Sequence, residues 1–131
     1  MRRARSRCEY CRVRGWPLTV DHVVPRAVWA ESRSPDHPDN LAVACYDCNI
    51  IGKRANTRGV DPLSGVEVEL FHPRRQRWTD HFAWSDDYLT LKGKTPTGWA
   101  TIAVLRLNGP NYRGQRRLLR LAMAAGGRRW P

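Results

Sequence analysis

Two Cys-x-x-Cys pairs constrain this sequence more than any other feature. All four cysteines belong to them, Cys8 with Cys11 and Cys45 with Cys48. A tetrahedral thiolate zinc site requires two such pairs, because each turn brings two sulfurs to about 2.3 Å from one ion. Disulfides are the alternative, but they are rare in a reducing cytosol and leave the spacing unexplained. We therefore expect a structural Zn²⁺ that ties the ends of segment 12–44 together and leaves no open position for water.

The apolar content indicates that the chain needs such a metal. The chain has 131 residues, which suits one domain with an appendage. Leu, Ile, Val and Phe together make up 26 of them, near the lower limit at which burial offsets the entropy of ordering. Six tryptophans and a structural metal would supply the remaining stabilisation.

The charge of the chain favours a polyanionic partner. The formal net charge is +11, and from Tyr88 to the end there are nine basic residues and no acidic one. Nucleic acid is the commonest polyanion available to such a protein, with a merely solvated basic surface as the alternative. A polar segment follows the basic N-terminal arm, and no stretch approaches the roughly 18 apolar residues of a membrane span. We expect a cytoplasmic protein that does not associate with membranes.

Short β-branched runs predict a hairpin around the cysteine pairs. Strands are expected at 18–24 and 41–44, with an irregular loop at 25–40 that is rich in Ser, Pro and Asp. A helix is expected over 45–56, with Asp47 near its start, where a carboxylate suits the helix dipole.

The second half of the chain predicts one strand and two helices. Val66, Val68 and Leu70 alternate with glutamates, as in a half-exposed strand. Thr95 is a suitable N-cap, with a proline after it, for a helix to about residue 107. Asn111 is expected to cap a last helix that ends at residue 125. Its expected apolar face comprises Leu118, Leu121, Ala122 and Ala125, and its basic stripe comprises Arg113, Arg117 and Arg120.

An Asp-His pair at the end of the first expected strand carries the candidate chemistry. Phosphodiester hydrolysis needs a positive centre on the phosphate, a base for water and a group that orients the base. The residue types suited to these roles are Asp21, His22 and, directly after Cys48, Asn49. Adjacent strand residues point to opposite faces, so the strand would have to twist or bulge for Asp21 and His22 to share one site. Taken alone, the pair also fits a turn aspartate and a surface imidazole.

The ordered set of Cys-x-x-Cys, Asp-His-x-x-Pro, Asn-Leu and Cys-x-x-Cys-Asn resembles the HNH endonuclease family over about residues 8–57. The resemblance implies an α+β fold with a zinc-stapled ββα-metal core at 1–57 and a small strand-plus-helices extension at 58–131 packed on it. It also implies that Asp21 and Asn49 bind a catalytic metal, that His22 is the general base, and that Asn40 braces the loop and orients His22.

Two departures from the family pattern concern the expected helix. Asn49 stands where histidine is common, an HNN variant whose oxygen ligands favour Mg²⁺ or Mn²⁺ over Zn²⁺ in the catalytic site. Gly52 stands where the family commonly has a basic residue, so Lys53 or Arg54 would contact DNA phosphate instead. Arg26 is a further candidate for the scissile phosphate, or else a surface arginine.

The remaining candidate residues lie in the extension, which resembles one found on many uncharacterised bacterial HNH proteins and brings no established role. Arg113, Arg117 and Arg120 are expected to hold the DNA backbone without sequence preference. His72 and His81 fit either extra ligands or packed histidines.

Three functions are compatible with these features. The first is a metal-dependent endonuclease that nicks double-stranded DNA as a monomer, with activity falling at acid pH because its base must be neutral. The second is a non-catalytic zinc-ribbon-like nucleic-acid-binding protein, and the third is a zinc-stapled module for an acidic protein partner. Sequence specificity, oligomeric state and biological pathway are not readable from the sequence.

Overall fold

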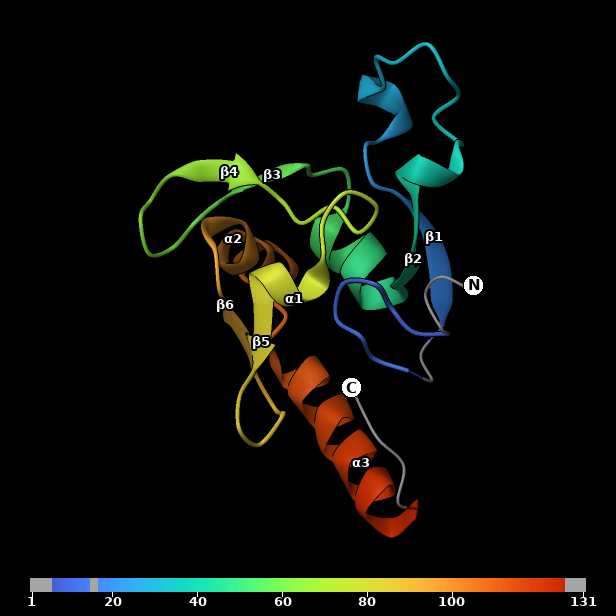
Figure 1. Cartoon of the computed structure of the whole chain (residues 1–131). Helices are drawn as coiled ribbons and strands as arrows, with labels where there is room; N and C mark the ends of the chain where they lie inside the picture. Colours follow the sequence, from blue (N-terminus) through green and yellow to red (C-terminus); the bar gives the residue numbers. More distant parts are fainter. Residues whose placement is uncertain (1–5, 15–16, 127–131) are drawn as a thin grey trace.

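Three two-stranded antiparallel sheets and several helices make up the computed structural model, which describes residues 6–14 and 17–126 (Figure 1). This mixed α+β architecture confirms the expected fold class. The first five residues of the basic arm and Arg128 and Arg129 lie outside the described residues.

The expected hairpin is present. β1 (Leu18–His22) pairs with β2 (Leu41–Cys45) in a register that runs unbroken from Leu18 opposite Cys45 to His22 opposite Leu41. β1 ends two residues earlier than predicted. The connecting loop holds two short 3₁₀ turns, η1 (Arg26–Val28) and η2 (Pro38–Asn40).

The segment after the second cysteine pair is helical but is wound as a π-helix. This segment, η3 (Asp47–Lys53), follows β2 directly, so Cys45 belongs to the strand and not to the predicted helix. A hydrogen bond of 2.8 Å from the Arg54 amide to the Asn49 carbonyl spans five residues, the spacing of a π turn. Such turns are rare and frequently mark functional sites.

Residues beyond the core form two small hairpins around a helix. β3 (Arg58–Val60) pairs with β4 (Glu67–Glu69), and β5 (Phe82–Trp84) pairs with β6 (Leu91–Gly93). The short helix α1 (Trp78–His81) leads into β5, and α2 (Pro96–Leu105) packs against η3, β3, β4 and β6. The Thr95 hydroxyl accepts a hydrogen bond of 3.1 Å from the Gly98 amide, which confirms the predicted N-cap.

The last helix, α3 (Pro110–Gly126), packs on a different face from the predicted one. It includes Asn111 instead of starting after it. Tyr112 and Arg116 are buried, whereas Leu118 and Leu121 are 63% and 68% exposed, so the face expected to be inside is outside. The prediction failed because the buried face is built around an aromatic ring and a guanidinium, which a hydrophobic pattern does not register. In Figure 1, α3 runs away from the body of the protein.

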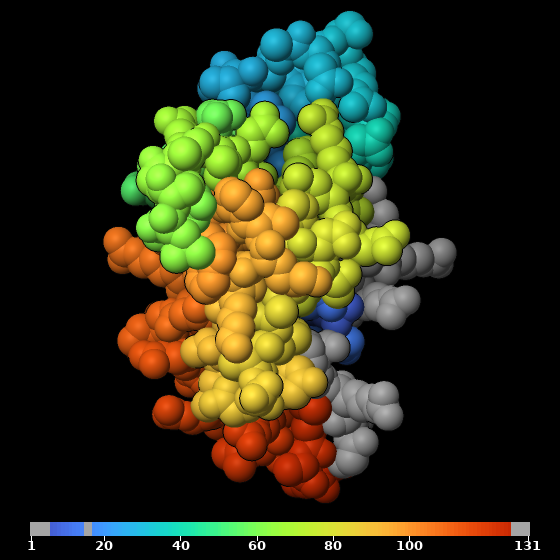
Figure 2. Space-filling model, turned by 60° about the vertical axis from the view of Figure 1, so that its left-hand side comes forward, coloured from blue at the N-terminus to red at the C-terminus, as the bar shows by residue number. Residues whose placement is uncertain are grey.

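An aromatic cluster joins the extension to the first cysteine pair. The Tyr10 ring meets Phe71 edge-on, with ring centroids 6.4 Å apart, and Phe71 in turn packs on Phe82 at 5.3 Å. Trp78 lies 5.1 Å from Phe82 and donates a hydrogen bond of 2.8 Å to the Tyr10 carbonyl. Figure 2 shows the part of the extension from β3 to α2 spread across one face, between the β1–β2 loop at one end and α3 at the other. No helix of the described residues has the length and apolar character needed to cross a membrane.

Candidate active site

The four cysteine sulfurs form a compact buried cluster. All four ligand atoms lie within 4.8 Å of one another, and no solvent reaches any of these side chains. The Cys11 and Cys45 sulfurs are 3.8 Å apart, too far for a disulfide and close to the edge of a tetrahedron with metal–sulfur bonds of about 2.3 Å. These residues therefore fit a closed structural zinc site, as the sequence predicted.

Full burial makes thiolates in the cluster costly unless a cation compensates their charge. Burial raises the pKa of the Cys11 and Cys48 thiols, because a thiolate there loses its water. A metal ion would supply the compensating charge. The extension also touches the cluster, since the Tyr112 hydroxyl lies 3.2 Å from the Cys48 sulfur. The division of the chain at residue 57 stays a prediction, and these contacts cross that boundary.

Asp21 is held from both sides. Its side chain is 4% exposed, and the Tyr10 hydroxyl donates a hydrogen bond of 2.6 Å to Oδ2. The Lys53 ammonium lies 3.3 Å from Oδ1. An ionised carboxylate accepts about four hydrogen bonds, so acceptor capacity remains on both oxygens.

Asp21, His22 and Asn49 border one open groove of about 430 Å³. The register of β1 with β2 is unbroken, so the strand has no bulge. The groove instead lies along the edge between β1 and η3, where side chains from both faces of the strand meet it. The Asn49 amide nitrogen donates to the Thr19 hydroxyl and the Val20 carbonyl, at 2.9 and 3.3 Å, which fixes Oδ1 as the acceptor. The Asp21 and Asn49 oxygens suit a hard cation such as Mg²⁺ or Mn²⁺.

Asp36 orients the ring of His22. The two side chains are 2.7 Å apart, from His22 Nε2 to Asp36 Oδ1, and the Arg26 guanidinium donates to the same oxygen at 2.7 Å. The Arg26 Nε also lies 3.4 Å from His22 Nε2, but a carboxylate only accepts hydrogen bonds, so the shorter contact with Asp36 favours the neutral tautomer with the proton on Nε2 and the lone pair on Nδ1. The pKa of Asp36 is lowered, first by the hydrogen bond from His22 and then by the charge of Arg26.

Asn40 braces the loop and does not bond to the His22 ring. Its side chain is buried and donates to the Val24 and Pro35 carbonyls, at 3.0 and 2.9 Å, while its oxygen accepts from the Val24 amide at 2.9 Å. Its effect on His22 is therefore indirect, since it fixes the backbone next to Asp36.

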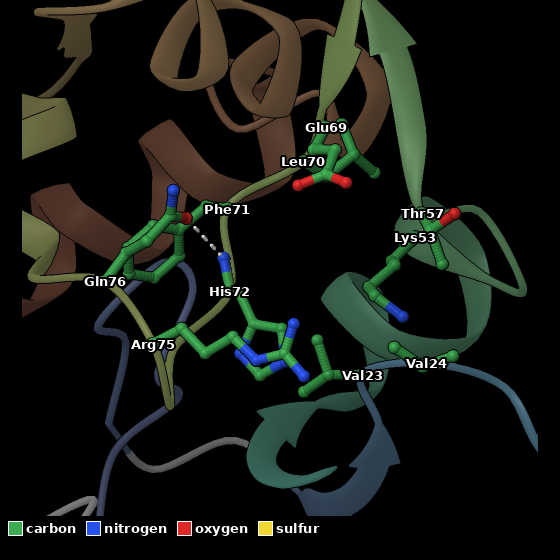
Figure 3. Close-up of a pocket in the computed structure, with 10 residues that line it drawn as sticks. All are labelled: Val23, Val24, Lys53, Thr57, Glu69, Leu70, Phe71, His72, Arg75 and Gln76. Atoms are coloured by element: carbon green, nitrogen blue, oxygen red, sulfur yellow. Dashed lines mark hydrogen bonds between the residues drawn. The ribbon is translucent and has the colours of Figure 1, made fainter. Parts of the chain in front are cut away.

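Lys53 lies inside the protein, which corrects the expected contact with DNA. Its side chain is 1% exposed, and its ammonium also contacts the His22 carbonyl at 3.4 Å. Burial lowers the pKa of Lys53, while the charge of Asp21 acts in the opposite direction. Figure 3 shows Lys53 reaching from η3 toward Val24, across a cavity of about 130 Å³ from His72 and Arg75. Lys53 follows Asn49 by four residues, so both side chains lie on the side of η3 that faces β1.

Like Arg26, Arg54 is a basic residue that borders the groove. It is exposed, and it also lines a second groove of about 610 Å³ between η3, α2 and the start of α3. Arg54 therefore joins two grooves, with Arg26 lining the first and Arg106 the second. Arg113, Arg117 and Arg120 are exposed on α3.

The histidines of the extension have structural contacts. His72 Nδ1 accepts from the Arg74 amide at 3.2 Å, and burial is the main reason that the pKa of His72 falls to about 4. His81 Nδ1 lies 2.6 Å from the Thr95 hydroxyl. Among the described residues, neither belongs to a group of three or more metal-binding side chains.

Sequence reasoning missed Tyr10 and Asp36. Tyr10 lies between two cysteines and contacts Asp21 eleven residues away, while Asp36 sits in a loop whose composition suggested only irregular structure. Neither position carries a periodic or motif signal. The one available hint for Tyr10 was a large aromatic residue within a tight cysteine turn.

Comparison with known proteins identifies part of the chain. The model of the HNH endonuclease family matches residues 8–52, which contain both cysteine pairs, the hairpin and most of η3. This confirms the family resemblance for that segment. No curated protein and no solved structure matches the chain.

Proposed function

We propose that this protein is a metal-dependent HNH endonuclease that hydrolyses DNA phosphodiester bonds, nicking double-stranded DNA as a monomer. One observation carries the proposal. His22, with Nε2 held by Asp36, borders the same groove as the oxygen-bearing side chains of Asp21 and Asn49. A general base and two ligands for a hard cation thus face one open site, which a zinc-stapled binding module does not need.

The proposed catalytic ion is Mg²⁺ or Mn²⁺ on Asp21 and Asn49, distinct from the structural zinc. When bound, it supplies positive charge for the scissile phosphate and the leaving oxygen. Two protein oxygens leave the rest of its coordination shell for water and substrate.

His22 takes the proton of the attacking water at Nδ1. Asp36 keeps that nitrogen unprotonated by accepting a hydrogen bond from Nε2–H, and its carboxylate then stabilises the imidazolium that forms. Because a protonated ring cannot act as base, nicking is expected to fall at acid pH.

DNA contacts are assigned to exposed arginines. Arg54 and Arg26 border the groove and would bind phosphate next to the cleaved bond, while the stripe on α3 adds contacts without sequence preference. Binding should weaken steeply with salt. We propose a cytoplasmic location, which the absence of a disulfide among the four cysteines supports.

The test is nicking of supercoiled plasmid by the zinc-loaded protein with Mg²⁺ or Mn²⁺. We expect nicked circles to accumulate before linear DNA, and His22→Ala to be at least about a hundredfold slower. His37→Ala is the matched control, since this half-exposed histidine lies in the loop that follows His22 and is not among the residues lining the groove.

Two results would contradict the proposal at different points. If wild-type protein binds DNA but cleaves none with any divalent metal, the non-catalytic nucleic-acid binder replaces it. If His22→Ala nicks as fast as wild type, the activity stands and the assignment of the base fails.

A further inference from the structure

Tyr10 links the zinc knuckle to the catalytic carboxylate. It lies between Cys8 and Cys11, and no solvent reaches its side chain. Its hydroxyl donates to Asp21 Oδ2 at 2.6 Å, a short bond typical of a charged acceptor. A phenol is protonated at neutral pH, so this hydroxyl is a donor.

The position of this hydroxyl is fixed by two parts of the chain. The cysteines on either side anchor the backbone of Tyr10, and the Trp78 indole donates to its carbonyl at 2.8 Å. Phe71 packs edge-on against its ring. The Arg12 guanidinium stacks on Trp78, 4.2 Å from the ring centroid. The zinc knuckle and the extension thus hold the phenol in place together.

We propose that Tyr10 is a positioning residue, which sets the orientation of the Asp21 carboxylate and makes catalytic metal binding depend on the zinc knuckle. This inference rests on the proposed function, because it takes Asp21 as a ligand of the catalytic ion. With Tyr10 on one oxygen and Lys53 on the other, the carboxylate cannot rotate freely. Its remaining acceptor positions are then preorganised for the ion.

Removing the hydroxyl has two opposing effects on Asp21. The carboxylate loses a donor, which raises its electron density and favours a cation. The carboxylate also gains freedom to rotate, and losing this freedom when the ion binds has an entropic cost. Removing hydrogen-bond partners of metal ligands typically lowers metal affinity by about 10–100-fold, so we expect the loss of orientation to dominate.

The experiment measures Mn²⁺ binding by titration calorimetry, without DNA, on zinc-loaded wild type, Tyr10→Phe and Tyr112→Phe. Tyr112→Phe is the matched control, because its buried hydroxyl contacts the Cys48 sulfur of the same zinc cluster but is not bonded to Asp21. Zinc content is measured for each protein. We expect full zinc content in Tyr10→Phe, with Mn²⁺ affinity reduced about 10–100-fold. Tyr112→Phe should bind Mn²⁺ like wild type.

Nicking assays separate this inference from the proposed function. In Tyr10→Phe the Mn²⁺ concentration for half-maximal nicking should rise, while the rate at saturating Mn²⁺ recovers. Unchanged Mn²⁺ affinity in Tyr10→Phe, or an equal loss in Tyr112→Phe, overturns the positioning role. If Tyr10→Phe binds Mn²⁺ more weakly but the wild type nicks no DNA, the positioning role of Tyr10 stands and the proposed nuclease activity is overturned. A wild type that binds no Mn²⁺ overturns both.

Discussion

Replacing Arg54 by glycine should stabilise the protein and weaken its binding to DNA. Arg54 has φ 54° and ψ −131°, the conformation of the first central residue of a type II′ turn, where glycine is preferred. The hydrogen bond of 3.0 Å from the Asn56 amide to the Lys53 carbonyl closes that turn. An arginine is strained there, and backbone strain of this kind is retained chiefly at functional sites.

The size of the stabilisation follows from two terms. A residue held in such a sparsely populated conformation costs about 1–3 kcal/mol. Glycine relieves this strain but loses about 0.5–1 kcal/mol more backbone entropy on folding. The net gain is about 1 kcal/mol, which raises Tm by about 4 °C in a chain of 131 residues. Arg54→Ala keeps the strain and removes the same guanidinium, so it should leave Tm nearly unchanged.

The affinity for DNA should depend on the charge of Arg54 and not on the backbone strain at this residue. One lost charge-assisted phosphate contact is worth about 1.5 kcal/mol, or roughly tenfold in affinity, and lowers the slope of log affinity against log salt by about one. Arg54→Gly and Arg54→Ala should lose the same DNA affinity. Arg58→Ala should keep the affinity of wild type, because Arg58 is paired with Glu67 and lines neither groove. Thermal unfolding and fluorescence anisotropy at several salt concentrations measure the two effects. Equal Tm values for the glycine and alanine variants would refute the strain, and unchanged DNA binding would refute the contact.

Three further outcomes are expected. Lys53→Met breaks a buried ion pair and should cost about 3–5 kcal/mol in urea unfolding, and adding Asp21→Asn should restore part of it if the pair is responsible. Asp36→Asn should slow nicking about tenfold at saturating metal by releasing the His22 ring, with unchanged Mn²⁺ affinity; equal rates would remove Asp36 from the mechanism. His72 has its pKa lowered to about 4 by burial, so the unfolded chain binds more protons between about pH 4 and 6.5. Stability should fall as pH drops through that window, and His72→Gln should flatten the fall in thermal unfolding curves.

Local sequence signals were sufficient for the elements that build the site. Two β-branched runs on either side of a polar loop predicted the hairpin, because a half-buried antiparallel pair needs little more than that. The cysteine spacing predicted the zinc cluster, since tight turns converge their sulfurs. Thr95 and Pro96 predicted the start of α2. Each of these signals spans a few neighbouring residues.

Local signals of this kind could not predict the contacts between distant segments. The hydrogen bond from Tyr10 to Asp21 and the ion pair of Lys53 with Asp21 depend on how the knuckle and η3 pack around β1. The buried face of α3 depends on Arg116, whose guanidinium lies 5.3 Å above the Trp84 ring and donates to the Leu89 carbonyl at 3.0 Å. A hydrophobic pattern assigns an arginine to solvent, so it selected the opposite face.

Gly52 connects the extension to the unusual winding of η3. A β-carbon at this position would lie 3.0 Å from the Leu105 Cα and 3.2 Å from its carbonyl oxygen, so a side chain here would push α2 away by a few tenths of an ångström. This close packing disfavours the basic residue common at this place in the family, and the next residue, Lys53, is the basic one. Lys53 and Asn49 are four residues apart and both contact β1, Lys53 through Asp21 and Asn49 through Thr19. The close packing of α2 on Gly52 therefore connects the extension, through η3, to the side chains that border the groove.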